Sequence, residues 1–481
     1  MMKNYKNLPT ETIEALKVKL TARECLLGDA AFYRKVAYVV LPMIVQNTLT
    51  NIVSLLDNVM VGQVGTLPMS AVAIVNQIIF IYYLCLWGSI AGAGIYSTQF
   101  IGKGDYEGVR YITRMKLVFS LFITLFTVAL LLIYGKTFVG FYIAANTPAA
   151  DRAAALGFAW QYLCIMLTGL FPFMISQCYA SALRESGQTV LPMAAGMIAM
   201  LVNFIFNALL IFGLLGFPKL GVAGAAIATV ISRFCEMAII MVRSHRSTYN
   251  YVYFKGLFRP FYIPGFMFPP VIKKTVPLLF SEFLWSFGQA ALLQCYSFRG
   301  ISVVAAMNIS NTVSQIFMEV FLSLGNATAI IIGQQLGAGD LLTARRTTFR
   351  MMVTSVTSCL VMGSLLCLCA PVIPRIYNTE DDIRSLATSL IIVVGITMFC
   401  SAIANVSYFT LRAGGKTWIT FAFDAGFTWL GSVPAAYYLC HYTLLSVPVV
   451  FFLVSLIELI KGFVGIALVK QGRWVVNIVN K

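Results

Sequence analysis

The feature that most constrains this chain is a series of about twelve apolar segments, each long enough to cross a lipid bilayer. A membrane-spanning helix needs about 20 apolar residues, because each residue adds about 1.5 Å and the hydrocarbon core is about 30 Å thick. Unpaired backbone groups are costly in lipid, so segments of this length predict helices. The predicted spans are 36–62, 70–98, 113–135, 156–182, 190–213, 221–243, 275–298, 303–333, 350–374, 385–410, 418–439 and 443–469.

Composition supports an all-α polytopic membrane protein. Charged residues make up 11% of the 481 residues and hydrophobic residues 59%, whereas soluble domains carry roughly 25% charged residues. The net charge of +16 lies mainly in loops between spans, which is better explained by membrane topology than by nucleic-acid binding. We therefore expect the lipid bilayer as a partner, no nucleic acid, and a monomer.

Charge in the loops predicts the orientation of the chain. Both termini and the even-numbered loops are basic, and cytoplasmic loops carry the excess of lysine and arginine. The central loop 244–274 is the most basic stretch after the N-terminus, whereas the loop with Glu380, Asp381 and Asp382 is acidic. We therefore expect both termini and the central loop in the cytoplasm.

The two halves of the chain resemble each other. Residues 72–76 match 304–308, and residues 183–189 match 411–417. Gly102-Lys103-Gly104-Asp105 likewise matches Gly337-Ala338-Gly339-Asp340, at an offset of 235 residues. Ordered matches at a nearly constant offset indicate duplication, and copies with six spans each have the same orientation. The predicted parts are a cytoplasmic N-terminal segment 1–35, an N-lobe 36–243, a cytoplasmic loop 244–274, a C-lobe 275–469 and a cytoplasmic tail 470–481.

Asp57 lies near the far end of the first span. An acid inside a span is expensive and indicates a functional site that binds a cation or a proton. The alternative is a carboxylate that reaches the outer interface and is solvated there.

Three further polar residues are candidates for the same site. Asn203 and Asn207 are four residues apart on the fifth span and so share one helix face. Thr229 lies in the small-residue run 221–229 of the sixth span. Amide oxygens suit Na⁺ or a protonated network, although polar residues also join helices in membranes.

The seventh span supplies candidates for a substrate cavity. Glu282 follows Pro277 by five residues, as Asn47 follows Pro42 in the first half. A carboxylate among aromatic side chains suits a lipophilic cation, whereas a polar patch at the cytoplasmic entrance is the alternative. The expected cavity residues are Gln46, Asn47, Glu282, Trp285, Gln289 and Tyr296.

No sequence pattern indicates an enzyme. The cysteines are scattered, and the two histidines are isolated, so we expect no metal beyond Na⁺ at Asp57, Asn203 and Asn207. Gly415-Lys416-Thr417 lacks the first glycine of a phosphate loop. We therefore expect no cofactor, and energy from an ion gradient or a substrate gradient unless a separate subunit supplies ATP.

These motifs resemble the multidrug and toxic compound extrusion (MATE) family. The resemblance rests on Asp57-Asn58-Val59-Met60-Val61-Gly62, the Val-Ala-x-x-x-Asn runs, the Leu-Arg-x-x-Gly turns and Gly221–Thr229. It implies a Na⁺- or H⁺-coupled efflux antiporter in the cytoplasmic membrane. Asp57, Asn203 and Thr229 match the family's cation or proton site, whereas Asn207 stands where the family has an aspartate.

We therefore expect export of amphipathic, often cationic, drugs by rocking of one lobe against the other. A flippase for a lipid-linked saccharide is the alternative. Such a protein is expected to have about fourteen spans and a cationic cavity for pyrophosphate, whereas the cavity candidates here are acidic or neutral.

Overall fold

The structure is a computed structural model that describes residues 18, 21, 24, 26–143, 148–247, 249, 251–377 and 379–480. The described residues form helices and connecting segments and contain no strand. The helices of the first half are α3 (Ala30–Gly62), α4 (Thr66–Lys103), α5 (Tyr106–Tyr142), α6 (Ala149–Glu185), α7 (Val190–Phe212) and α8 (Val222–Arg246). Those of the second half are α9 (Phe268–Ser297), α10 (Ile301–Gly337), α11 (Leu341–Cys369), α12 (Asp381–Ala413), α13 (Thr417–Phe427), α14 (Val433–Tyr442) and α15 (Val447–Gln471).

Short 3₁₀ turns lie in the connections at η2 (Leu214–Gly216), η3 (Val252–Phe254), η4 (Gly265–Met267) and η5 (Ile373–Ile376). The order of the helices confirms the predicted all-α membrane fold. Eleven helices among the described residues are long and apolar enough to cross a membrane. The remaining predicted span, 418–439, corresponds to α13, the π-helical segment η6 (Thr428–Ser432) and α14, which follow one another without a gap. A π-helical turn inserts a wider ring of backbone hydrogen bonds, so it divides this span into two shorter α-helices.

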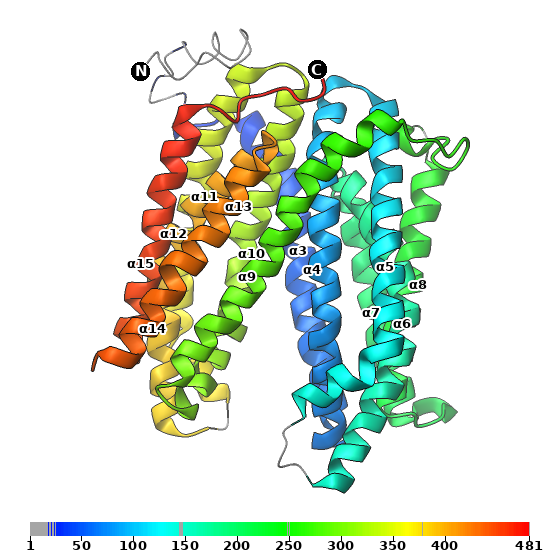
Figure 1. Cartoon of the computed structure of the whole chain (residues 1–481), viewed down its shortest axis with the longest axis vertical. Coiled ribbons are helices and arrows are strands. Elements are labelled where there is room, and N and C mark those ends of the chain that lie inside the picture. The colour runs from blue at the N-terminus through cyan, green and yellow to red at the C-terminus, as the bar shows by residue number, and fades with distance from the viewer. Residues whose placement is uncertain are drawn as a thin grey trace. The chain divides into compact units, whose positions relative to one another are not determined.

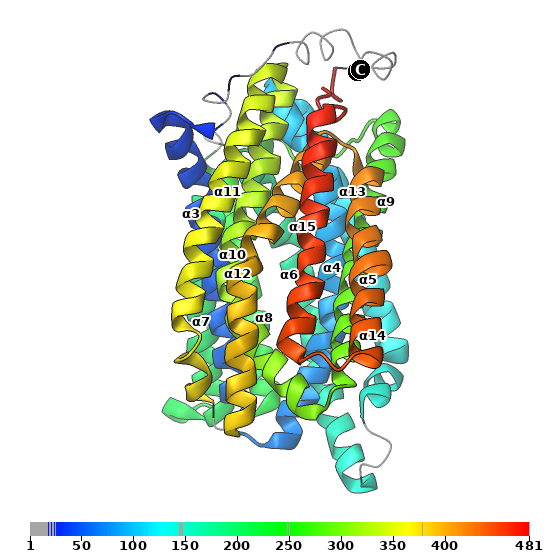
Figure 2. The same cartoon turned by 90° about the vertical axis from the view of Figure 1, so that its left-hand side faces the viewer.

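Two compact units share the chain. Unit 2 comprises residues 45–97 and 106–270, and unit 1 comprises residues 1–44, 98–105 and 271–481. Within each unit the long helices run side by side (Figures 1 and 2).

The unit boundaries differ from the predicted lobe boundaries, because α3 and α4 each contribute to both units. Val36 and Met43 of α3 belong to an apolar cluster with Leu324, Met351 and Val406 of unit 1. The first part of α3 therefore packs with helices of the second half. The functional limits of the two lobes remain a prediction.

Candidate functional site

Four of the predicted residues come together in unit 2. Asn207 on α7 donates from Nδ2 to Asp57 Oδ1 on α3 at 2.6 Å. The same nitrogen lies 3.0 Å from Asn203 Oδ1, one turn earlier on α7. Asn203 in turn lies 3.2 Å from the Thr229 hydroxyl on α8. The four side chains thus form one continuous hydrogen-bonded cluster across three helices, which we call the Asp57 cluster.

Both asparagine amides of the Asp57 cluster can donate hydrogen bonds to the Asp57 carboxylate. When the Asn203 amide is turned over, its nitrogen donates to Asp57 Oδ1 at 2.9 Å and Oδ2 at 3.2 Å. Its oxygen then accepts from the Thr229 hydroxyl at 3.2 Å. The surrounding partners decide the orientation of an amide, and this orientation gives the carboxylate a second donor.

One hydrogen-bond acceptor of the Asp57 cluster has no donor among the described residues. Asn207 is 1% exposed and Asn203 is 5% exposed, whereas Asp57 is half-buried. The Asn207 Oδ1 atom is buried and has no hydrogen-bond partner among the described residues. A buried acceptor without a donor is costly, so this oxygen is available to a bound cation or to a protonated carboxyl group.

Arg233 extends the cluster along α8. It follows Thr229 by four residues, so both side chains lie on one face of the helix. Its guanidinium carbon lies 4.4 Å from the ring centre of Phe173, and a guanidinium nitrogen lies 3.6 Å from Glu236. Arg233 and Glu236 are three residues apart, a spacing that places both side chains on one face of the helix.

The positive charge of Arg233 also attracts the Asp57 carboxylate. The two groups are not in direct contact, because the ion pairs found among the described residues do not include Asp57. Sequence reasoning did not place Arg233 beside this site. The four-residue spacing from Thr229 was the signal that could have done so.

Gln46 and Asn47 are both half-buried on α3. Gln46 lies against α7, where a Cβ atom added at Gly196 would stand 3.0 Å from Gln46 Nε2. Gly196 therefore provides the space that this amide occupies. The assignment of both residues to a substrate cavity remains a prediction.

The candidates on α9 differ from one another in exposure. Glu282 is half-buried, Trp285 is 40% exposed and Gln289 is exposed. Tyr296 is 1% exposed and packs edge-on against Phe451 in the apolar core of unit 1. The first three residues thus offer accessible polar and aromatic surface, whereas Tyr296 contributes to packing in this structure. Their role in substrate binding remains a prediction.

Unit 1 contains a charged cluster that sequence reasoning found only in part. Lys461 Nζ on α15 lies 2.8 Å from Asp424 Oδ1 on α13 and 3.4 Å from Glu458 Oε1. The Glu458–Lys461 contact joins residues three apart on one helix, whereas Asp424 comes from another helix and was missed by sequence reasoning. An acid within an apolar span, as Asp424 is in 418–439, was the available signal.

We call these three residues the Lys461 cluster. Lys461 is 8% exposed, and its Nζ lies 5.7 Å from the ring centre of Phe423. The carboxylate of Asp424 also repels that of Glu282 on α9. The π-helical segment η6 begins four residues after Asp424, and the Thr428 hydroxyl donates to the Asp424 carbonyl oxygen at 3.0 Å.

A second buried ion pair lies in unit 2. Lys116 on α5 is 0% exposed and lies 2.5 Å from Glu185 at the end of α6. Ser181 donates to Glu185 and accepts from Lys116. A Cβ atom at Gly94 would stand 2.5 Å from Glu185 Oε1, so the glycine is needed for the carboxylate to fit. All the polar atoms of this pair are engaged locally, which indicates a structural role.

No described group of three or more histidine, cysteine, aspartate or glutamate residues could hold a metal ion.

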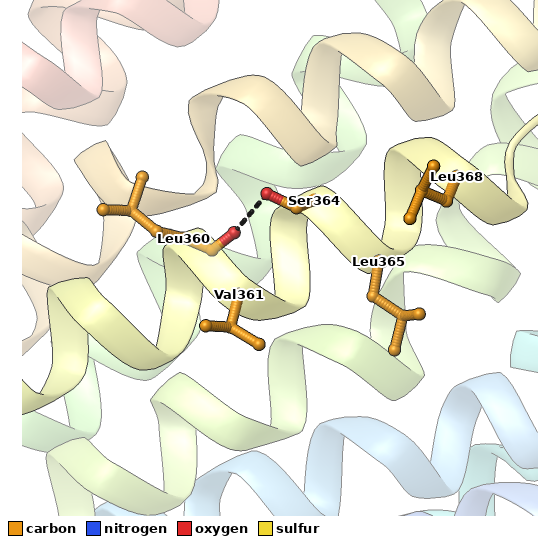
Figure 3. A pocket seen from close by; sticks show the side chains of 5 residues that line it. All are labelled: Leu360, Val361, Ser364, Leu365 and Leu368. Atoms are coloured by element: carbon orange, nitrogen blue, oxygen red, sulfur yellow. Dashed lines mark hydrogen bonds between the residues drawn. The ribbon is translucent and has the colours of Figure 1, made fainter.

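An apolar pocket on α11 is lined by Leu360, Val361, Ser364, Leu365 and Leu368 (Figure 3). The Ser364 hydroxyl donates to the Leu360 carbonyl oxygen at 2.8 Å. The four apolar side chains are exposed, as expected for a surface that faces lipid, and the pocket presents no charged group to a ligand.

Comparison with known proteins gives consistent matches. The family model MatE matches residues 42–209 and again residues 277–438. The two matches fall in the two halves of the chain, as the internal duplication predicts.

Individual relatives match across most of the chain. The "Probable multidrug resistance protein NorM" of Thermotoga maritima is 24% identical over 84% of this chain and 84% of its own. The "Multidrug resistance protein MdtK" of Pectobacterium atrosepticum is 23% identical over 84% of this chain and 87% of its own. An outward-facing structure of a multidrug resistance MATE family transporter is 18% identical, with a TM-score of 0.83 over 95% of this chain and 100% of that one.

Proposed function

Because this chain belongs to the MatE family, we propose that it is an antiporter that exports amphipathic, often cationic compounds in exchange for H⁺ or Na⁺. The observation that carries this proposal is the Asp57 cluster. It contains a half-buried carboxylate that accepts a 2.6 Å hydrogen bond from a fully buried asparagine. An acid in a membrane span with such partners is suited to taking up and releasing a cation.

The open acceptor in the cluster suggests how uptake would proceed. A protonated Asp57 carboxyl group has an O–H donor, and the unpartnered Asn207 Oδ1 is a nearby acceptor once that amide turns. A bound Na⁺ would instead be held by oxygens of Asp57, Asn203 and Asn207. In either case the ion changes the hydrogen bonds that join α3, α7 and α8, which gives uptake a structural consequence.

Substrate would bind where α9 exposes Trp285 beside the half-buried Glu282. An aromatic face and a carboxylate together attract an organic cation. Uptake of the coupling ion at the Asp57 cluster and release of the drug outside would then alternate as the lobes rock. This cycle requires a plasma-membrane location, with the basic loops and both termini in the cytoplasm.

Flippase activity on a lipid-linked saccharide is the second candidate. Recognition of a pyrophosphate group needs several cations in the binding cavity. The expected cavity residues Glu282, Trp285 and Gln289 include an acid and no base, so the antiporter is the better supported function.

Dye export from proteoliposomes tests the proposal. We expect the wild-type protein to move a cationic dye when an H⁺ or a Na⁺ gradient is imposed, and Asp57→Asn to abolish this movement. Asp151→Asn, which changes an exposed acid in the first turn of α6, is the control and should keep wild-type export. Full gradient-driven export by Asp57→Asn, or equal dye movement without any gradient, would contradict the proposal.

A further inference from the structure

The ends of α4 and α10 cross at very close range within unit 1. A Cβ atom at Gly102 would stand 1.8 Å from the carbonyl oxygen of Gln334, and one at Gly337 would stand 1.9 Å from that of Gln99. Gln99 and Gln334 are equivalent in the internal repeat, as are Gly102 and Gly337. The contact is therefore reciprocal, like the interface of a two-fold dimer. Only glycine permits this approach, so the crossing is a specific feature of the repeat.

The C-terminal segment 472–480 lies on this crossing. The Gln99 amide, 0% exposed, accepts from Ile478 N at 2.8 Å and donates to Val476 O at 3.4 Å. Its Nε2 also donates to Ala413 O, at the end of α12, at 3.1 Å. On the α10 side, Asn477 Nδ2 donates to the carbonyl oxygen of Gly337 at 3.1 Å. The segment thus hydrogen-bonds to both helices of the crossing.

A buried anchor holds the segment in place. Trp474 is 1% exposed, and Val475 is 0% exposed. The indole Nε1 donates to Val469 O at 2.9 Å. A Cβ atom at Gly414 would stand 2.0 Å from Trp474 O, so the turn after α12 has room for the segment because it lacks a side chain.

The equivalent segment of the first half is attached differently. Gly414 corresponds to Ser186 in the repeat, and the Tyr253 hydroxyl lies 2.7 Å from the Ser186 hydroxyl. Arg114 on α5 then donates three hydrogen bonds of 2.7 Å to carbonyl oxygens of the segment that follows Tyr253, at Gly256, Leu257 and Tyr262. Each half thus returns its chain to the end of its fourth span, and in the second half the returning segment 472–480 also hydrogen-bonds to both helices of the α4–α10 crossing.

We propose that the C-terminal segment 472–480 is a latch that holds the α4–α10 crossing closed, with Gln99 as its positioning residue. The helix α4 begins in unit 2 and ends in unit 1, so a restraint on its last turns holds that end of the helix against α10 within unit 1. The inference rests on the proposed alternating access, because a latch has a function only if the crossing opens during the cycle.

Hydrogen–deuterium exchange of the full-length protein in lipid nanodiscs tests this inference. Gln99→Leu keeps the volume of the side chain and removes its hydrogen bonds, and Asn477→Leu removes the bond to α10. We expect each variant to raise the exchange rate of amides in 99–105 and 334–340 at least fivefold, while amides in the middle of α12 and α15 exchange as in the wild type.

Arg473→Gln, in the same segment but exposed, is the control and should exchange as the wild type does. A chain that ends after Gln471 should reproduce the effect of Gln99→Leu, and it keeps the test decisive if that variant fails to fold. Unchanged exchange at both helix ends would overturn the proposal. Faster exchange throughout unit 1 would overturn it too, because the segment would then be part of the core.

This measurement separates the latch from the transport proposal. Asp57→Asn should leave exchange at the crossing unchanged in the absence of gradients, whereas it should abolish dye export. Failure of dye export in the wild type would contradict the proposed function without changing the exchange pattern.

Discussion

The helices α8 and α15 occupy the same place in the two halves, and each has 25 residues. Each carries an i,i+3 ion pair at the same position along the helix, but the order of charges is reversed. The pair on α8 is Arg233–Glu236, and the pair on α15 is Glu458–Lys461. Both halves thus place an ion pair at the same position along this helix, and contacts with other helices determine which residue of the pair is basic.

The surroundings explain the reversal. On α15 the lysine takes the second position and meets Asp424, so one buried cation is shared by two acids. On α8 the arginine takes the first position, rests on Phe173 and has a single acid at 3.6 Å. The carboxylate of the neighbouring Asp57 forms no ion pair with the residues that the structure describes. The Lys461 cluster is therefore expected to serve stability, and the Asp57 cluster to serve transport.

The largest expected effect on stability comes from Lys461→Met. Removing one partner of a buried ion pair leaves an uncompensated charge, which costs about 3–5 kcal/mol of the free energy of unfolding. Chemical unfolding in detergent micelles measures this loss. Lys219→Met, at an exposed position, should change stability by less than about 0.5 kcal/mol. A loss no greater than that of the control would refute the assignment of Lys461 to stability.

Reversing the pair on α15 should cost somewhat less. The double variant Glu458→Lys with Lys461→Glu gives α15 the charge order of α8 and places a carboxylate against Asp424. We expect a loss of about 2–3 kcal/mol, because the new lysine offsets part of the repulsion. Adding Asp424→Asn should recover at least half of the loss, as a mutant cycle on unfolding would show. No recovery would mean that Asp424 does not dictate the order of charges.

Arg233→Met should have a smaller effect. Its side chain is 29% exposed, and its guanidinium has one acid and one aromatic ring as partners, which together contribute about 1–2 kcal/mol. The same unfolding measurement applies, with the exposed Arg243→Met on the same helix as control. If Arg233→Met costs as much as Lys461→Met, the contrast between the two clusters fails.

Asp57→Asn should affect stability least. The new amide oxygen still accepts from Asn207, so only the charge-assisted part of one hydrogen bond is lost, about 1 kcal/mol. Transport by this variant should nevertheless be abolished. A loss of stability above about 3 kcal/mol would identify Asp57 as a structural residue, and the loss of export would then have no bearing on coupling.

Much of the fold could be predicted from the sequence. Spans such as 190–213 and 221–243 differ from α7 and α8 by only a few residues at their ends, because a helix in lipid must be apolar for the whole thickness of the bilayer. The spacing of Asn203 and Asn207 predicted a shared helix face, and one amide hydrogen bond joins them.

The ion pairs that join different helices were not predicted. Lys116 and Glu185 are 69 residues apart, and Asp424 and Lys461 are 37 apart. Local spacing predicts pairs on one helix, such as Glu458 with Lys461, because residues three or four apart always lie on the same face. The spacing of residues along one helix does not indicate which faces of two different helices are in contact.

The sequence by itself determined the number of spans, the duplication and the polar residues inside the spans, since each follows from the length, order and composition of apolar segments. Only the tertiary structure decided that Asp57 meets Asn207, 150 residues away, and that Lys461 is shared by two acids. It also decided that the C-terminal segment lies on the α4–α10 crossing. These contacts depend on how helices pack, and packing is set by the shapes of whole helix surfaces, including glycines such as Gly102, Gly337 and Gly414 that allow backbones to approach.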